Sequence, residues 1–66
     1  MAFNQTFTLR DDAVRHAVQI AMTRNILMVF WQNGPLWETE TYAASPRMDV
    51  VTARYVLPRG EIVKLS

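Results

Sequence analysis

The longest apolar stretch of the chain covers residues 26–31, and a turn-forming Asn-Gly-Pro cluster at positions 33–35 follows it closely. Six apolar residues are too few to span a membrane, and a continuous apolar run that ends at a turn is typical of a buried strand. Beyond the turn, residues 36–42 alternate: Trp and Thr occupy the odd-numbered positions, and Leu, Glu and Tyr occupy the even-numbered ones. This alternation is typical of a strand whose two faces differ. The pattern predicts a β-hairpin over residues 26–42, with both tryptophans beside its turn.

The first arm of this hairpin is apolar on both of its faces, because neighbouring residues of a strand point to opposite sides. One side carries Ile26, Met28 and Phe30, and the other carries Leu27, Val29 and Trp31. A single helix can cover only one side. The other side must be closed by another layer of the chain, by a second copy or by a partner.

A helix is predicted over residues 10–24. Its apolar positions recur at i, i+3, i+4 and i+7, namely Val14, Ala17, Val18 and Ala21, and its polar positions Asp12, His16, Gln19 and Thr23 point the opposite way. We expect the side chain of Thr8 or Asp11 to cap the N-terminus of this helix. Arg24 and Asn25 are residues typical of a helix C-terminus.

Three further stretches have strand character. Residues 3–9, 49–57 and 61–65 alternate, Pro58-Arg59-Gly60 predicts a turn between the last two, and residues 43–47 form a connection because Ser45-Pro46 disfavours helix. The expected fold is α+β, one amphipathic helix packed on a mainly antiparallel sheet, in the order β-α-β-β-β-β. The pairing of the first strand and the sheet face that meets the helix stay open at this stage.

Composition bounds how such a chain can be stabilised. Residues 1–66 are expected to form a single small domain, half hydrophobic and a fifth charged, near the size at which a core alone is only marginally stable. With no cysteine and a single histidine, disulfides and the usual zinc sites are excluded, so self-association into a homo-oligomer is expected. The absence of a signal peptide and of a membrane-length apolar segment predicts a cytoplasmic protein without a membrane partner.

The candidate catalytic groups have simpler interpretations. Asp12 lies one helical turn before His16, the spacing of an ordinary surface pair, with no nucleophile arranged beside it. Glu38 and Glu40 share one strand face, and we interpret them as a solvated face that protects a sheet edge, since two acids are too few ligands for a cation. We therefore predict no catalytic residue, no cofactor, no metal site and no enzymatic activity.

The aromatic hairpin favours a protein-binding function. Interfaces are enriched in aromatic residues, methionine and arginine, and so small a domain cannot bury all of them. The candidate contact residues are Trp31, Leu36, Trp37 and Tyr42. The expected function is a non-enzymatic interaction or regulatory module that binds another protein, a second copy, or both. Its size also fits accessory factors, including those of phages or other mobile elements.

The alternative is a small nucleic-acid-binding protein. Although the net charge is only +1, six of the seven basic residues are arginine, which suits contacts to phosphates. The candidate residues are Arg47, Arg54, Arg59 and Lys64, with Tyr55 or Trp37 as stacking groups. Against this alternative, Tyr55 is expected to point away from Arg54, and Trp37 shares its strand with two glutamates.

Overall fold

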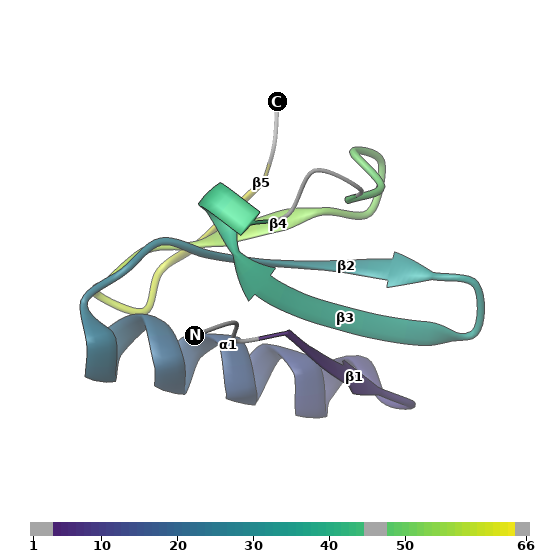
Figure 1. Ribbon diagram of the computed structural model, residues 1–66, viewed down its shortest axis with the longest axis horizontal. Helices are drawn as coiled ribbons and strands as arrows, with labels where there is room; N and C mark the ends of the chain where they lie inside the picture. The colour runs from purple at the N-terminus through teal and green to yellow at the C-terminus, as the bar shows by residue number, and fades with distance from the viewer. Residues whose placement is uncertain (1–3, 45–47, 65–66) are drawn as a thin grey trace.

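The computed structural model describes residues 4–44 and 48–64. Along the chain its elements are β1 (Gln5–Phe7), α1 (Arg10–Arg24), β2 (Met28–Asn33), β3 (Leu36–Thr41), the 3-10 helix η1 (Tyr42–Ala44), β4 (Arg54–Val56) and β5 (Ile62–Lys64). The strands form one antiparallel sheet in the order β1-β3-β2-β4-β5, and α1 lies across one side of it (Figure 1). The predicted α+β fold and its β-α-β-β-β-β order are therefore confirmed.

The helix α1 has the predicted bounds. Asp11 and Asp12 in the first turn and Arg24 in the last complement the helix dipole. The helix ends where Asn25 adopts the left-handed conformation, with φ 57°, and donates its backbone N–H to the carbonyl of Ala21. Its beginning differs from the expectation, because Leu9 occupies the N-cap position and no described side chain hydrogen-bonds there.

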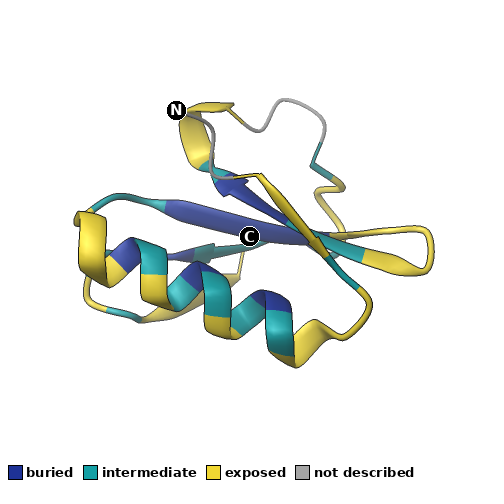
Figure 2. Cartoon of the chain, turned by 60° about the horizontal axis from the view of Figure 1, so that its bottom comes forward, coloured by how far each residue is buried: buried dark blue, intermediate teal, exposed yellow. Residues whose placement is uncertain are grey.

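The stripe of α1 that meets the sheet is centred on alanines. Ala13, Ala17 and Ala21 are fully buried, and their small side chains let the helix approach the sheet closely. In Figure 2 these buried positions form a band on α1 that turns toward the sheet, while the opposite side of the helix is exposed. The expectation that His16 points away from the apolar stripe is wrong in part. Its ring lies 5.3 Å from that of Phe7, centroid to centroid.

The apolar strand β2 is covered on both sides by the chain itself. On the side of the sheet where α1 packs, here called the helix side, the core contains Ala17, Ala21, Met28, Phe30 and Val56. On the opposite side, here called the outer face, Val29 and Trp31 pack with Ala53, Met48 and Tyr55. The connection between β3 and β4 therefore supplies a partial third layer over the outer face.

The strand predicted over residues 49–57 is shorter than expected. Residues 50–52 form a turn, and only Arg54–Val56 of this stretch pair in the sheet. The second hairpin is confirmed, because β4 and β5 pair through Tyr55 and Val63. Gly60 adopts φ +95° in the intervening turn. The first strand pairs with β3, which settles a point that the sequence left open.

This pairing makes β3 an interior strand, so the interpretation of Glu38 and Glu40 as a solvated edge is wrong. Glu40 is only 5% exposed and Glu38 is half-buried. The Oε1 atom of Glu40 accepts a hydrogen bond from the backbone N–H of Thr41 at 2.8 Å. Among the described residues, no helix combines the length and apolar character needed to cross a membrane.

Candidate functional site

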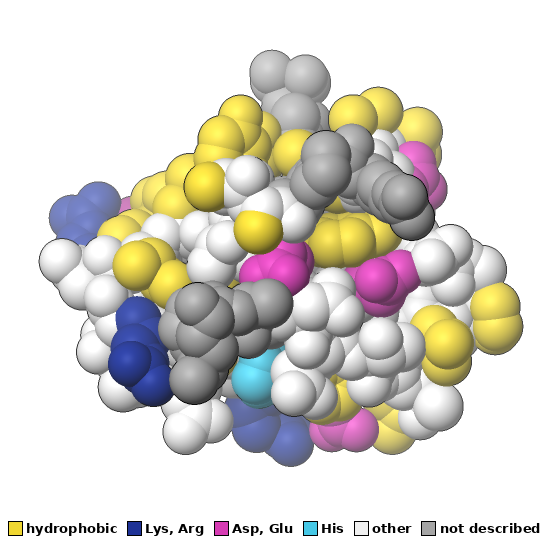
Figure 3. Space-filling view, in the orientation of Figure 1, with side chains coloured by type: hydrophobic (Ala, Val, Ile, Leu, Met, Phe, Trp, Pro, Cys, Tyr) yellow, Lys and Arg dark blue, Asp and Glu magenta, His cyan; other side chains and the backbone are white. Residues whose placement is uncertain are grey.

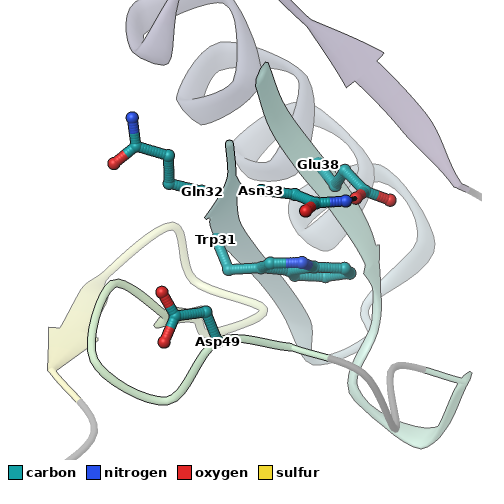
Figure 4. A pocket seen from close by; sticks show the side chains of 5 residues that line it. All are labelled: Trp31, Gln32, Asn33, Glu38 and Asp49. Atoms are coloured by element: carbon teal, nitrogen blue, oxygen red, sulfur yellow. Dashed lines mark hydrogen bonds between the residues drawn. The ribbon is translucent and has the colours of Figure 1, made fainter. Parts of the chain in front are cut away.

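The candidate site is built around the indole of Trp31 on the outer face. Trp31 pairs with Glu38 across the β2–β3 ladder, and it is only 4% exposed. The Nδ2 group of Asn33 donates a hydrogen bond to Oε2 of Glu38, which fixes both side chains at the turn end of the hairpin. Figure 4 shows the indole lying between this pair and the segment that carries Asp49. Three separate segments therefore enclose one aromatic ring.

Asp49 organises the segment on the far side of the indole. Its carboxylate accepts hydrogen bonds from the backbone N–H of Val51 at 3.1 Å and from the hydroxyl of Thr52 at 3.3 Å. Its carbonyl accepts from the backbone N–H of Ala53 at 2.8 Å. The Thr52 hydroxyl in turn accepts from the backbone N–H of Gln32 at 2.9 Å, so this turn is attached directly to β2. A local Asp-centred turn thus holds a carboxylate beside Trp31.

A pocket of about 350 Å³ opens between these segments. It is lined by Trp31, Gln32, Asn33, Glu38 and Asp49 (Figure 4). The lining combines the indole of Trp31, the amide group of Asn33 and two carboxylates, whereas the side chain of Gln32 points away from the indole. Within residues 4–44 and 48–64, neither carboxylate forms an ion pair. The pocket is therefore a negatively charged concavity rich in hydrogen-bond acceptors.

A second feature of the outer face is an apolar strip made of Tyr42, Tyr55 and Val63. The rings of Tyr42 and Tyr55 meet edge to face with centroids 5.3 Å apart. Val63 lies opposite Tyr55 on the neighbouring strand. Tyr42 is 46% exposed and Val63 is 41% exposed. The outer strip thus extends from η1 after β3, across β2, to β4 and the edge strand β5.

The surroundings of Tyr55 favour its protonated phenol. Partial burial raises the pKa of Tyr55 above its ordinary value, and a side-chain hydrogen bond and charge interaction with Tyr42 raise this pKa further. Each effect disfavours the phenolate of Tyr55. The strip therefore presents the neutral phenol of Tyr55 and the ring of Tyr42 in edge-to-face contact.

The four interface candidates from the sequence do not form a single surface. Trp31 lies in the outer-face cluster and Tyr42 in the outer strip, whereas Trp37 packs on the helix side against Phe30, with ring centroids 6.2 Å apart. Leu36 is exposed at the turn of the hairpin. Trp37 is also covered by the guanidinium of Arg10, whose central carbon lies 5.8 Å from the ring centroid. Trp37 is therefore half-buried and belongs mainly to the core.

The structure brings together two of the four basic candidates. Arg54 and Lys64 are direct partners across the β4–β5 ladder, and Arg54 is paired on its other side with Phe30 of the helix-side core. Arg59 instead forms an ion pair with Glu61 at 2.9 Å. Arg47 lies outside the described residues. As the sequence predicts, Tyr55 and Arg54 occupy adjacent positions of one strand and so point to opposite faces.

The candidate acid and base of α1 are not brought together. Asp12 contacts Arg15 at 3.4 Å, whereas His16 faces the ring of Phe7. The described residues contain no group of three or more histidine, aspartate or glutamate side chains that could hold a metal ion.

Several residues of the site escaped the sequence interpretation. The sequence interpretation assigned Asp49 and Val63 only to strands. It assigned Gln32 to the first arm of the hairpin and Asn33 to the turn. One signal was present: Asp49 precedes Thr52 by three positions, a spacing at which aspartate often organises a turn. Comparison with known proteins found no matching family, no similar curated protein and no similar solved structure.

Proposed function

We propose that this chain is a small cytoplasmic, non-enzymatic interaction or regulatory module that binds another protein through the outer face of its sheet. The observation that carries the proposal is the outer strip, in which Tyr42 and Val63 are each more than 40% exposed on a face that α1 does not cover. Tyrosine is favoured at protein interfaces because its large ring loses little conformational freedom on binding.

The organisation of the strip supports this function. The edge-to-face contact and the hydrogen bond between Tyr42 and Tyr55 hold both rings before any partner arrives. Fixing side chains in advance lowers the entropy cost of association. Figure 3 shows apolar side chains along the upper part of this view and acidic side chains near its centre and right, just below them, whereas basic side chains lie at the left and at the bottom, where a further acidic side chain is also seen. A partner therefore meets apolar and acidic groups together.

Size sets a limit on this contact. A stable interface buries about 800 Å² on each partner, and the described chain exposes 4358 Å² in all. Three side chains are too few to supply that area, so the partner must also cover neighbouring groups. Val50 and Val51, exposed in the connection before β4, are available for this purpose.

The experiment compares two neighbouring residues that have similar exposure on opposite faces of β5. Val63 belongs to the outer strip, whereas Ile62 pairs with Val56 on the helix side and is 44% exposed. Tagged wild-type protein, Val63→Ser and Ile62→Ser are used to capture proteins from a bacterial lysate treated with nuclease, after circular dichroism confirms that each is folded. We expect a stoichiometric polypeptide that Val63→Ser loses and Ile62→Ser retains. Equal loss in both variants, or no stoichiometric band, would contradict the proposal.

A second copy of the chain is the other protein that could cover the strip. Sedimentation velocity of the purified protein over a range of concentrations tests this case. A dimer that Val63→Ser dissociates and Ile62→Ser preserves would identify the chain itself as the partner, as the homo-oligomer prediction requires.

Nucleic-acid binding remains the second candidate function, supported by the pairing of Arg54 with Lys64 on the helix side. Within the described residues, neither cation has an acidic partner. Lys64→Gln and Arg59→Gln remove the same charge, but Arg59 is already paired with Glu61. Nucleic acid that is captured by the wild type, eluted by moderate salt and lost in Lys64→Gln but not in Arg59→Gln would favour this alternative.

A further inference from the structure

We propose that the pocket beside Trp31 receives the guanidinium group of an arginine carried by the protein bound on the outer face. The inference rests on the function proposed above and specifies the chemistry of the partner. Its starting point is the lining of the pocket, in which the only charged groups among the described residues are the carboxylates of Glu38 and Asp49.

The charge of this pocket is not neutralised by the described part of the chain. Asp12 and Glu61 each pair with an arginine, whereas Glu38 and Asp49 have no such partner within residues 4–44 and 48–64. Both carboxylates accept hydrogen bonds from neutral donors, Glu38 from Asn33 and Asp49 from Val51 and Thr52. These bonds hold the carboxylates in place and leave their negative charge to attract a cation.

The shape and the acceptors of the pocket select the kind of cation. Two carboxylates from different segments, together with the amide oxygen of Asn33, offer acceptors beside the indole of Trp31 around a volume of about 350 Å³. A guanidinium has five N–H donors in a planar fork, whereas an ammonium acts as a compact point charge. Trp31 supplies an apolar wall for the aliphatic part of an arginine side chain. Calcium is a poorer match because it takes six to eight oxygen ligands.

The pocket lies close enough to the outer strip for one partner segment to occupy both. Tyr55 is the ladder partner of Val29, and Trp31 is two residues further along β2 on the same face. Two residues of a strand span about 7 Å. An extended segment with an apolar side chain over the strip therefore places an arginine a few residues away at the pocket.

The test uses a small probe, so that it does not depend on the partner. N-acetyl-arginine methylamide is titrated into ¹⁵N-labelled protein, with the citrulline and lysine methylamides as a neutral isostere and a compact cation. The indole N–H signal of Trp31 reports the pocket, and that of Trp37, on the helix side, is an internal control. We expect a saturating shift at Trp31 with the arginine compound only, and no shift at Trp37.

Matched variants decide whether the carboxylate is responsible. Glu38→Gln preserves shape and removes the charge, and Glu61→Gln removes an equivalent charge in the β4–β5 turn, away from the pocket lining. We expect Glu38→Gln to lower the affinity for the arginine compound about tenfold, as loss of a charge-assisted hydrogen bond implies. We expect Glu61→Gln to leave this affinity unchanged.

Four results would overturn the assignment: equal shifts with the citrulline compound, equal binding of the lysine compound, equal weakening by both variants, or no shift at Trp31. The proposed function fails separately, when Val63→Ser and Ile62→Ser capture the same proteins while the arginine compound still binds the wild type.

Discussion

Thr39 and Glu40 occupy consecutive positions of β3, point to opposite faces and are both buried. Thr39 is fully buried, and its hydroxyl oxygen has no hydrogen-bond partner within the described structure. Glu40 is satisfied in part by the backbone N–H of Thr41. A buried polar atom without a partner costs free energy because it gives up its hydrogen bonds to water. Removing the hydroxyl group of Thr39 would therefore relieve an energetic cost, whereas removing the carboxylate of Glu40 would break a hydrogen bond.

Replacing Thr39 by valine is expected to stabilise the protein. The substitution keeps the shape of the side chain and removes the unpartnered hydroxyl, so the free energy of unfolding should rise by about 1 kcal/mol. Urea denaturation measures this change, with Thr6→Val on the exposed strand β1 as a control for the strand preference of valine. A loss of stability in Thr39→Val would mean that the hydroxyl has a partner in solution.

The raised pKa of Tyr55 predicts a loss of stability in alkaline solution. The folded state holds the phenol proton above the ordinary tyrosine pKa of about 10, whereas the unfolded chain releases it there. The unfolded state then binds fewer protons, so the free energy of unfolding falls as pH rises beyond that point. Denaturation at about pH 9 and about pH 11 should show a smaller fall in Tyr55→Phe than in the wild type. An identical fall in both proteins would contradict this account.

At the scale of elements, α1 and the second hairpin meet where Gly60 lies against the last turns of the helix. A Cβ atom added at Gly60 would lie 3.0 Å from Sδ of Met22 and 3.8 Å from Val18. At Gly34, in the first hairpin, no atom of the described residues lies within 4 Å of the equivalent position. Their backbones also differ, with φ +95° at Gly60 and +63° at Gly34, and only the second lies in the left-handed region open to other residues.

Alanine substitution should therefore cost more at Gly60 than at Gly34. Gly34→Ala is expected to lower the free energy of unfolding by about 1 kcal/mol, the usual cost of placing an L-residue in the left-handed region. In Gly60→Ala, both the unfavourable φ and the contact with Met22 destabilise the folded state. The free energy of unfolding is therefore expected to fall by about 2 to 3 kcal/mol. Thermal or urea denaturation of both variants tests the order. Equal costs would show that the β4–β5 turn relaxes freely against the helix.

Elements were predicted well where their signals are local. The bounds of α1 follow from its periodicity and from Asn25, and the first hairpin follows from Asn33-Gly34-Pro35. Residues 49–53 were predicted as strand because Val50 and Val51 favour extended structure. Residues 50–52 form a turn because Asp49 binds its own neighbours and Thr52 binds Gln32, twenty positions away.

The site was harder to predict because its parts are distant in sequence. Trp31 and Glu38 come from the hairpin, but Asp49 joins them only through the connection between β3 and β4. Interface candidates chosen by residue type included Trp37, which the fold uses in the core with Phe30 and Arg10. Tyr42 was chosen because it is an aromatic residue of the predicted hairpin, whereas its association with Tyr55 and Val63 depends on the order of the strands in the sheet.

The whole molecule has two unlike sides. The helix side carries α1 and the paired cations Arg54 and Lys64, whereas the outer face carries the outer strip and the acidic pocket beside Trp31. The β3–β4 connection covers only part of that face. We propose that a partner protein covers the rest of the outer face.

Site-specific photocross-linking tests this claim most directly. p-Benzoyl-L-phenylalanine is placed at Tyr42 in the outer strip or, in a matched variant, at Gln19, which is exposed on α1. Both proteins are irradiated in a nuclease-treated bacterial lysate, and cross-linked polypeptides are identified by mass spectrometry. The account predicts one dominant adduct from position 42, absent from position 19. An adduct from position 19 without one from position 42 would place the binding surface on the helix side and contradict the account.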